Sequence, residues 1–298
     1  MTIAYLIFAY KNPQLINRAI RVLTNEQCDF FVHIDRKSNI NDFSRIQGQN
    51  VFLMQKRIPV YWAEFSGVEA ILLLIRQALA HARTYDYFVL LSGSEYPLRS
   101  ARYIHAFFEQ HQGLEFISTV RMPNEDAGKP ISRIDTMRFP SSQPFRRFVG
   151  RALARVGLAR RDHKAYLRGL EPYSGNTWWA LTRDACHHIS QFADHNPYLE
   201  SYFRNVFAPE EIFFHTILGN SPFRSRVRRN LIYEDWSERG PRPQMIDERH
   251  VAFFKSREKI CADDIYGEGE LLFARKFSDD RLLLVDSLDE MIGQSKGL

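Results

Sequence analysis

The sequence predicts an α/β fold built on a mostly parallel sheet with helices on both faces. Two observations lead to this prediction. Hydrophobic runs of strand length alternate with segments of helical periodicity along the first third of the chain. These runs are nearly continuous and lack the polar alternation of a strand with one wet face, which indicates strands buried on both sides.

The predicted elements follow one another in a regular order. Residues 2–10 form an apolar run, and residues 11–25 carry apolar side chains at helical spacing. Further strands are expected at 29–35, 50–54 and 86–93, and a strong helix at 66–85 with Ser66 as its N-cap. The stretch GNTWWALTRDACHHI (175–189) is typical of a strand that leads into a helix. Another helix is expected to begin at Pro209, because proline suits a first helical turn.

Composition and length indicate one globular domain over residues 1–298. Hydrophobic residues make up 45% of the chain and charged residues 25%, so a core can form without disulfides. We find no internal repeat or clear linker, and we treat residues 120–170, an irregular stretch rich in Arg and Pro, as a variable basic region of that domain.

The sequence favours a cytoplasmic location. Its N-terminus has no basic segment before the apolar run and no small-residue cleavage site after it. No apolar stretch approaches the roughly 20 residues that cross a bilayer. The three cysteines, Cys28, Cys186 and Cys261, match no metal-ligand spacing and fit a reducing compartment.

Positive charge is concentrated at residues 145–164, where seven Lys and Arg residues stand against Asp162. Interleaved apolar residues predict a basic amphipathic helix, which could contact an anionic membrane surface or an acidic acceptor. A solvated surface helix explains the same pattern equally well. Nucleic-acid binding is not supported, because no nucleic-acid motif accompanies the charge.

Ligands of a parallel α/β sheet bind beyond the carboxyl ends of its strands. The loops after Tyr10, Ile34 and Leu91 are therefore the expected ligand side, and they carry Asp35 and Glu95. Neither a GxGxxG nor a GxxxxGK[ST] motif is present, so a dinucleotide site or P-loop is not supported. A loop-capping role is the alternative interpretation of Asp35.

The same loops argue against a divalent metal. Enzymes that hold a sugar nucleotide through Mg²⁺ or Mn²⁺ supply clustered carboxylates, but here the segment SGSEYP offers Glu95 alone. Without a metal, cations of the protein must neutralise a diphosphate. Arg275 and Lys276 in the aromatic bracket FARKF are candidates, although such a pair is also common on plain surfaces.

Two further motifs allow both a structural and a chemical interpretation. Glu210 and Glu211 in PEEIFF complement the positive end of a helix dipole, or supply a general base beside aromatic residues. The pair Trp178–Trp179 could stack on sugar rings, or point one ring into the core and one outward.

Six segments in order resemble the core-2/I-branching glycosyltransferase family, which includes branching β-1,6-N-acetylglucosaminyltransferases and peptide O-xylosyltransferases. They span nearly the whole chain except about 120–170, and the xylosyltransferase branch is the nearer one. The segments are AYLIFAYKNPQLINRAI, FFVHIDRKS, YFVLLSGSEYPLRS, GNTWWALTRD, FAPEEIFFHTIL and LLFARKFSDD.

This resemblance implies a GT-A-type nucleotide-sugar domain and an inverting transfer from a UDP-sugar without a metal cofactor. It implies that Glu211 is the general base and that Arg275 and Lys276 bind the diphosphate. Ala9, Tyr10, Asp35 and Trp62 would lie on the nucleotide side, and Thr177, Trp178, Trp179 and Glu95 on the sugar or acceptor side.

Two departures from the family pattern leave the substrates open. Thr177 stands where xylosyltransferases have an acid, and Glu95 replaces the usual Asp. We expect a UDP-sugar donor carrying xylose or N-acetylglucosamine and a glycan or lipid-linked acceptor, as in bacterial polysaccharide biosynthesis. An inactive nucleotide-sugar-binding module and a UDP-sugar hydrolase are the alternatives. Candidates for a third phosphate contact are Arg239, Arg242 and Arg249.

Overall fold

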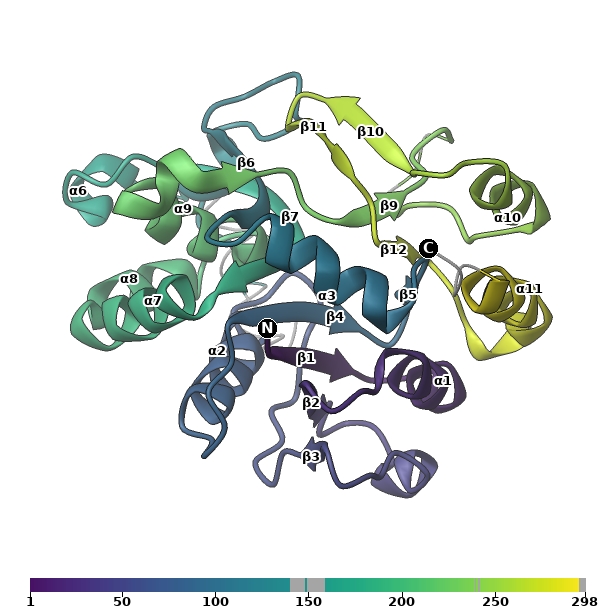
Figure 1. Ribbon diagram of the computed structural model, residues 1–298. Helices are drawn as coiled ribbons and strands as arrows, with labels where there is room; N and C mark the ends of the chain where they lie inside the picture. Colours follow the sequence, from purple (N-terminus) through teal and green to yellow (C-terminus); the bar gives the residue numbers. More distant parts are fainter. Residues whose placement is uncertain (140–147, 149–158, 239, 241, 295–298) are drawn as a thin grey trace.

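The computed structural model describes residues 1–139, 148, 159–238, 240 and 242–294. A seven-stranded sheet of order β3-β2-β1-β4-β7-β6-β8 forms the centre (Figure 1). Its strands are β1 (Ile3–Ala9), β2 (Cys28–Ile34), β3 (Val51–Leu53), β4 (Tyr87–Ser92), β6 (Glu115–Arg121), β7 (Tyr173–Thr182) and β8 (Val227–Arg228). All pairings are parallel except those of β7 with β4 and β6. The predicted α/β class with a mostly parallel sheet is confirmed.

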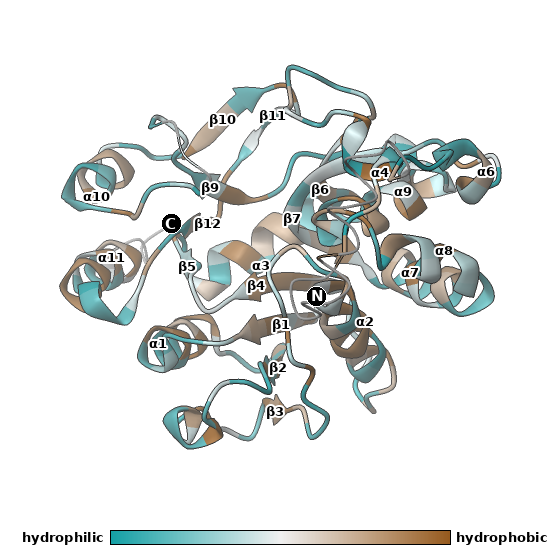
Figure 2. Cartoon of the chain, turned by 180° about the vertical axis from the view of Figure 1, so that it is seen from behind, coloured by the Kyte–Doolittle hydropathy of each residue, from teal (hydrophilic) through white to brown (hydrophobic). Residues whose placement is uncertain are grey.

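The register of the parallel strands aligns their carboxyl ends. In β1, Ile3 pairs with Cys28 of β2 and with Tyr87 of β4, so all three strands end at one edge of the sheet. Nearly every residue of these strands is buried, and the sheet interior is hydrophobic (Figure 2). Both faces of the sheet are covered, and this explains why the apolar runs in the sequence are continuous, as predicted.

Helices cover the sheet and join it to a second core. The larger ones are α1 (Pro13–Leu23), α2 (Ser66–Leu79), α3 (Ala101–Gln110), α7 (Arg183–His195), α8 (Pro197–Phe203), α9 (Phe213–Gly219), α10 (Glu248–Lys255) and α11 (Leu282–Gln294). Helix α1 buries Ile16 and Ile20 in the core around the sheet, and Leu15 and Ala19 in a separate core with α10 and α11. The short helices are α4 (Ser132–Asp135) and α6 (His163–Leu167).

A three-stranded sheet of order β5-β12-β9 lies beside the edge at which β1, β2 and β4 end, and it brings a late strand, β12, to that edge. It consists of β5 (Tyr96–Pro97), β12 (Phe273–Arg275) and β9 (Ile232–Glu234). Strand β5 follows the loop after β4, so β12 lies next to that loop (Figure 1). A hairpin of β10 (Cys261–Asp264) and β11 (Gly267–Glu270) precedes β12.

One predicted helix start and one predicted N-cap are wrong. Residues Pro209–Glu211 form a 3-10 turn, named η2, and α9 begins only at Phe213, because Ala208 is left-handed and Ile212 departs from helical angles. The N-cap of α2 is Phe65, whereas the Ser66 hydroxyl accepts a hydrogen bond from the Tyr61 backbone N–H at 2.9 Å. That bond anchors the preceding loop, so local hydrogen bonding outweighs the capping preference.

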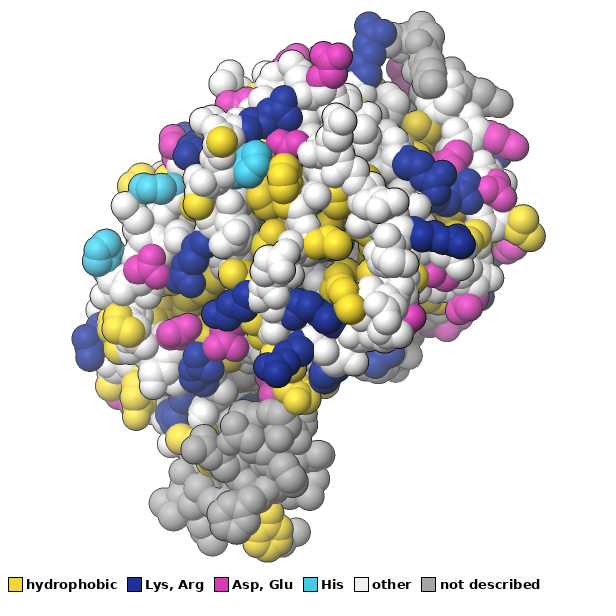
Figure 3. All heavy atoms as spheres, turned by 90° about the horizontal axis from the view of Figure 1, so that it is seen from below, with side chains coloured by type: hydrophobic (Ala, Val, Ile, Leu, Met, Phe, Trp, Pro, Cys, Tyr) yellow, Lys and Arg dark blue, Asp and Glu magenta, His cyan; other side chains and the backbone are white. Residues whose placement is uncertain are grey.

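Most of the basic segment 145–164 lies outside the described residues, so its predicted helix stays a prediction. The described face in Figure 3 carries Lys and Arg side chains in a band beside a recess with hydrophobic side chains. Within the part of the chain that the structure describes, no helix has both the length and the apolar character needed to cross a membrane.

Candidate functional site

Glu211 is held by contacts from three separate elements. Its Oε2 lies 2.7 Å from Nζ of Lys129 and 2.6 Å from Nη1 of Arg133, which belongs to α4. The hydroxyl of Ser174 in β7 donates to the Glu211 carbonyl oxygen at 2.9 Å. Lys129 also donates to the Gly175 carbonyl at 2.9 Å. Both cations contact Oε2, and Oε1 has no hydrogen bond to any described residue.

The two cations determine the charge of Glu211. Burial by itself raises the pKa of this carboxyl, but Lys129 and Arg133 outweigh burial and lower the pKa below its ordinary value. Glu211 is therefore an anion at neutral pH. Burial also lowers the pKa of Lys129, although Glu211 counteracts that effect. A fixed carboxylate with one unbonded oxygen can accept a proton from a bound hydroxyl group.

Glu211 opens onto a cavity of about 710 Å³. Its side chain keeps 27% of its surface exposed. The cavity is lined by the cations that hold Glu211, by Asn176 of β7, and by aromatic side chains of the surrounding loops. Trp62 stands at its rim, 73% exposed, with its ring centroid 5.7 Å from that of Phe207. A cavity of this size, with aromatic and polar lining, can accommodate a sugar.

Arg275 lies between two carboxylates. Its Nη1 is 3.0 Å from Glu234 Oε1, and its Nε is 2.8 Å from Glu95 Oε1 in an ion pair that is not an aligned hydrogen bond. The small sheet produces this arrangement, since Arg275 of β12 pairs in register with Glu234 of β9 and β5 follows Glu95. The guanidinium also lies 4.8 Å from the ring centroid of Trp178.

Lys276 forms no ion pair with a described residue. Burial and, after it, the neighbouring charges of Arg275, Arg242 and Lys11 lower its pKa to about 8, whereas Glu95 acts in the opposite direction. A lysine whose pKa is depressed by neighbouring cations marks a place where positive charge is in excess and an anion is favoured.

The three arginines considered as further phosphate contacts differ in placement. Arg239 lies outside the described residues. Arg249 is exposed and paired with Asp247 at 2.8 Å. Arg242 is exposed and close enough to lower the pKa of Lys276. Of the two arginines that the structure describes, Arg242 is therefore the one placed at the Lys276 cluster.

The nucleotide-side residues lie at the carboxyl edge of the sheet. The Asp35 backbone N–H donates to the Ala9 carbonyl at 2.7 Å, and Tyr10 next to it is 61% exposed. The Asp35 carboxylate accepts from the backbone N–H groups of Lys37 at 2.9 Å and Val60 at 3.3 Å. Asp35 therefore fixes its own loop, and its contact with Val60 links this edge to the loop that carries Trp62 to the Glu211 cavity.

The residues expected to contact sugar lie deeper than the sequence suggested. Trp178 is 6% exposed, stacks on Phe8 and lies beneath Arg275, whereas Trp179 is 2% exposed and contacts Phe214. Glu95 is buried and also accepts from the Ser92 backbone N–H. Thr177 is half-buried between Asn176 and Trp178. Trp178 and Glu95 thus support Arg275, and their own surfaces are largely covered.

Sequence reasoning missed the residues that hold the charged groups. Lys129 and Arg133 lie in the region interpreted as variable, and Glu234 and Asn176 form no recognisable motif, though Asn176 donates to Glu234 Oε2 at 3.0 Å. A buried lysine is a strong sign of a functional site, but the sequence alone does not show that Lys129 is buried. No local pattern in the sequence identifies these four residues.

Clustered metal ligands are absent from the described residues, where no group of three or more His, Cys, Asp or Glu side chains could hold a metal ion. His215 is fully buried, and burial, followed by the charge of Lys129, lowers its pKa to about 3. Asp279 accepts from the backbone N–H groups of Gln14 and Leu15 at the start of α1. These side chains therefore serve structural contacts.

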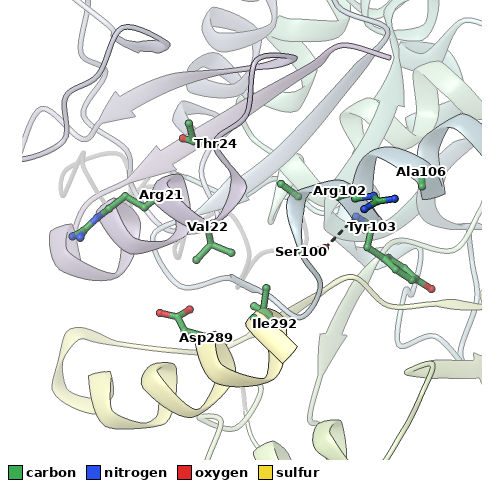
Figure 4. A pocket seen from close by; sticks show the side chains of 11 residues that line it. Arg21, Val22, Thr24, Ser100, Arg102, Tyr103, Ala106, Asp289 and Ile292 are labelled. Carbon is green, nitrogen blue, oxygen red and sulfur yellow. Dashed lines mark hydrogen bonds between the residues drawn. The ribbon is translucent and has the colours of Figure 1, made fainter. Parts of the chain in front are cut away.

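A second cavity, of about 740 Å³, lies away from Glu211 between α1, α3 and α11. Figure 4 shows Val22, Tyr103 and Ile292 contributed by these three helices. Ser100 in its wall accepts from the Tyr103 backbone N–H as the N-cap of α3. The carboxylate in its wall, Asp289, is paired with Arg18 at 2.6 Å and joins α11 to α1. This pair serves packing between helices, so we place the candidate site at Glu211.

Comparison with known proteins shows similarity to xylosyltransferases over most of this chain. Xylosyltransferase 2 of Canis lupus familiaris is 25% identical over 246 residues, which is 80% of this chain and 27% of the relative. Xylosyltransferase 1 of Homo sapiens is 24% identical over 232 residues, 75% of this chain and 23% of the relative. The chain thus spans about a quarter of the length of these relatives.

Among solved structures, galactosyltransferase LgtC in complex with donor and acceptor sugar analogues superposes with a TM-score of 0.40 at 12% identity, covering 99% of this chain and 97% of that one. The family model described as Core-2/I-Branching enzyme matches residues 3–256. Because this match covers most of the 298 residues, the chain belongs to the Core-2/I-branching enzyme family.

Proposed function

We propose that the protein is an inverting, metal-independent glycosyltransferase of the GT-A type. It transfers xylose or N-acetylglucosamine from a UDP-sugar to a hydroxyl group of a glycan or lipid-linked acceptor. The observation that carries the proposal is Glu211, an ionised carboxylate fixed through Oε2, whose Oε1 has no bond to a described residue and borders a cavity large enough for a sugar. Membership of a family of branching enzymes supports the same reaction class.

In the proposed step, the acceptor oxygen forms a bond to the anomeric carbon from the face opposite UDP. Glu211 Oε1 takes the proton of the attacking hydroxyl group. The bond from the anomeric carbon to the diphosphate breaks, and UDP leaves with the electron pair. An α-linked donor therefore gives a β-linked product. Positioned general-base help of this kind contributes roughly 10²–10⁴ in rate.

The leaving diphosphate would be stabilised by Lys276, Arg275 and Arg242. Lys276 is free of ion pairs with described residues and surrounded by positive charge, so it takes the phosphate directly as a point charge. Glu95 and Glu234 hold Arg275 in a fixed orientation, and its positive charge also stabilises the leaving diphosphate. This concentration of fixed cations supports the proposal that no divalent metal is needed.

Uridine would lie along the carboxyl edge at Ala9, Tyr10 and Asp35, and the acceptor would occupy the Glu211 cavity. Trp62 stands on the loop between the two places, at the rim of the cavity. In this proposal the anomeric carbon would lie between Lys276 and Glu211. The sugar-side residues Trp178, Trp179, Thr177 and Glu95 then support the site from below, with Trp178 and Glu95 fixing Arg275.

Calorimetry with a panel of UDP-sugars in the presence of EDTA tests the donor side. We expect one UDP-sugar to bind wild type without metal, and Lys276→Ala to lose that binding. Arg249→Ala is the matched control, since Arg249 is exposed and paired with Asp247, and it should bind as wild type does. A requirement for divalent metal in wild type would refute the role of Lys276.

Glu211→Gln tests the chemistry with UDP release as the readout. The variant should bind the UDP-sugar normally and lose roughly 10²–10⁴ in transfer rate. Release that needs no acceptor would identify a hydrolase instead. Binding with no turnover of any donor or acceptor in wild type would identify an inactive binding module.

We further propose that the enzyme acts in bacterial polysaccharide biosynthesis in the cytoplasm, with residues 145–164 in peripheral contact with an anionic membrane. The charge of that segment in the sequence supports this proposal. Replacing its arginines by glutamine should weaken binding to vesicles that contain phosphatidylglycerol. Unchanged binding would remove the membrane contact.

A further inference from the structure

Glu210, the residue before the proposed base, is a buried carboxyl group that the proposed transfer step does not use. Its Oε2 is buried and has no hydrogen-bond partner among the described residues. Both Glu210 and Glu211 line the cavity of about 710 Å³. An unpaired buried carboxylate is costly, so such a group normally finds a partner or keeps its proton.

The cations near Glu210 are committed to its neighbour. Lys129 Nζ and Arg133 Nη1 both contact Glu211 Oε2, at 2.7 and 2.6 Å. On the other side Glu210 packs near Gly67 of α2, where a methyl group on Gly67 would lie 3.9 Å from Glu210 Oε2. Glu69, the acid in the first turn of α2, is itself paired with Arg204 at 2.7 Å.

The local charges favour the neutral form of Glu210. Burial and, after it, the negative charge of Glu211 raise the pKa of Glu210 to about 8, because Arg133 and Lys129 counteract them only in part. Of two adjacent carboxyls, Glu211 thus holds the negative charge and Glu210 holds the proton. Two acids at one site with opposite protonation states can serve two different roles.

We propose that Glu210 is a protonated carboxylic acid that donates a hydrogen bond from Oε1, the oxygen that is not buried against α2, to a hydroxyl oxygen of the acceptor sugar in the Glu211 cavity. This inference rests on the proposed transferase function and deepens it. Glu211 accepts from the attacking hydroxyl group, and Glu210 donates to a neighbouring one. The acceptor is therefore a sugar with two adjacent hydroxyl groups on the face that meets η2.

Ionisation of Glu210 would remove this donor and place a second negative charge beside Glu211. The hydrogen bond to the acceptor would become a repulsion between lone pairs. Acceptor affinity should therefore fall as the pH rises through about 8. The donor affinity also depends on pH through Lys276, so the acceptor KM, measured at saturating UDP-sugar, is the quantity that isolates Glu210.

Infrared spectroscopy of the full chain tests the proton directly and needs no substrate. Wild type at pH 7 should show the band of a protonated carboxyl group, and Glu210→Gln should lack it. The band should disappear as the pH is raised above about 8. Absence of a protonated-carboxyl band at pH 7 would overturn the proposal.

Kinetics test the hydrogen bond, using the oligosaccharide of a glycan array that gives the fastest UDP release with wild type. Glu210→Ala should raise the acceptor KM about tenfold at pH 7, the value of a hydrogen bond of about 1.4 kcal/mol. Glu210→Gln, which still donates from its amide, should lose the alkaline rise in acceptor KM. Glu69→Gln, outside the cavity, is the control and should behave as wild type.

An acceptor KM that Glu210→Ala leaves unchanged would show that the carboxyl group only fills space, and would overturn the proposal. An alkaline rise that persists in Glu210→Gln would overturn it as well. If no acceptor supports UDP release by wild type, the proposed function itself fails. The infrared band, which is independent of turnover, keeps the two failures distinguishable.

Discussion

The pairing of Lys129 with Glu211 shows how a single buried cation determines the character of the proposed base. Lys129 is almost fully buried and bonded to both Glu211 and the Gly175 carbonyl. Its charge keeps Glu211 ionised in surroundings that would otherwise favour the neutral acid. Arg133 holds the same oxygen, so the unbonded Oε1 keeps a fixed direction.

Replacing Lys129 by methionine should shift the acid limb of the pH–rate profile upward. In wild type the pKa of Glu211 is lowered, so activity should be lost only at a pH below the ordinary pKa of glutamate. Without the lysine, burial is less opposed and the pKa rises, by about one unit or more for a lost charge at this distance. The measurement is kcat/KM between pH 4 and 8. The control is Arg121→Met, which removes an exposed ion pair with Glu171 and should leave the acid limb of the profile in place. An acid limb that does not move in Lys129→Met would contradict the role of the lysine.

Lys276 should make UDP-sugar binding weaken above pH 8. Its pKa in the free protein is about 8 because of burial and neighbouring cations, and the protonated form is the one that binds phosphate. Above that pH binding must take up a proton, so affinity falls by up to about tenfold per pH unit. Calorimetry in buffers of different ionisation enthalpy measures this uptake. Equal affinity at pH 7 and pH 9 would count against a direct lysine contact.

Among the elements, β7 packs so closely at Gly175 that no larger residue fits there without a shift. Its residue Gly175 faces β6 at a register shift, where a methyl group would lie 1.6 Å from the Ser118 carbonyl oxygen and 2.7 Å from His215 Cε1. The carbonyl of the same glycine holds Lys129. The packing of β6 against β7 and the geometry of the proposed base therefore depend on one position.

Gly175→Ala should destabilise the protein by roughly 1–3 kcal/mol, because the backbone oxygen of Ser118 cannot move without opening the sheet. Denaturant unfolding followed by circular dichroism provides the measurement. Gly293→Ala is the matched control, since nothing lies within 4 Å of a methyl group there and alanine favours the helix. Equal stability of the two variants would show that β6 and β7 can adjust.

The turn η2 shows where element prediction depends on context. The pattern PEEIFF favours a helix from Pro209, yet Ala208 and Ile212 separate a 3-10 turn from α9. The Ser174 hydroxyl holds the Glu211 carbonyl, and Pro209 is buried. These tertiary contacts fix the turn, and they direct Glu210 and Glu211 into one cavity.

Across the whole molecule, two buried histidines should make stability fall on mild acidification. Burial lowers the pKa of His33 to about 4 and that of His215 to about 3. His33 Nε2 accepts the Ile58 backbone N–H at 2.8 Å, which requires the neutral ring. Both folded-state pKa values lie below the unfolded value, so stability present above about pH 6.5 is lost as the pH falls.

Between pH 7 and pH 5 the two histidines together should cost about 4 kcal/mol, roughly 2 kcal/mol each. Denaturant unfolding at the two pH values measures the loss. His33→Gln, whose side-chain carbonyl can still accept the Ile58 N–H, should reduce the pH dependence by about half. A variant with the full wild-type pH dependence would show that His33 is not a source of it.

The sequence by itself determined the α/β class, the parallel order of the early strands and the family. It also placed Asp35 and Tyr10 at the ligand edge, because those inferences depend on hydrophobic periodicity and on local motifs. Tertiary structure decided what each charge does. It gave Glu211 its cations from Lys129 and Arg133 and bound Arg275 to Glu95 and Glu234. It left Glu210 Oε2 without a hydrogen-bond partner among the described residues. The physical reason is that the charge state of a buried group depends on burial and on neighbours brought close in space, and here those neighbours lie up to 180 residues away along the chain.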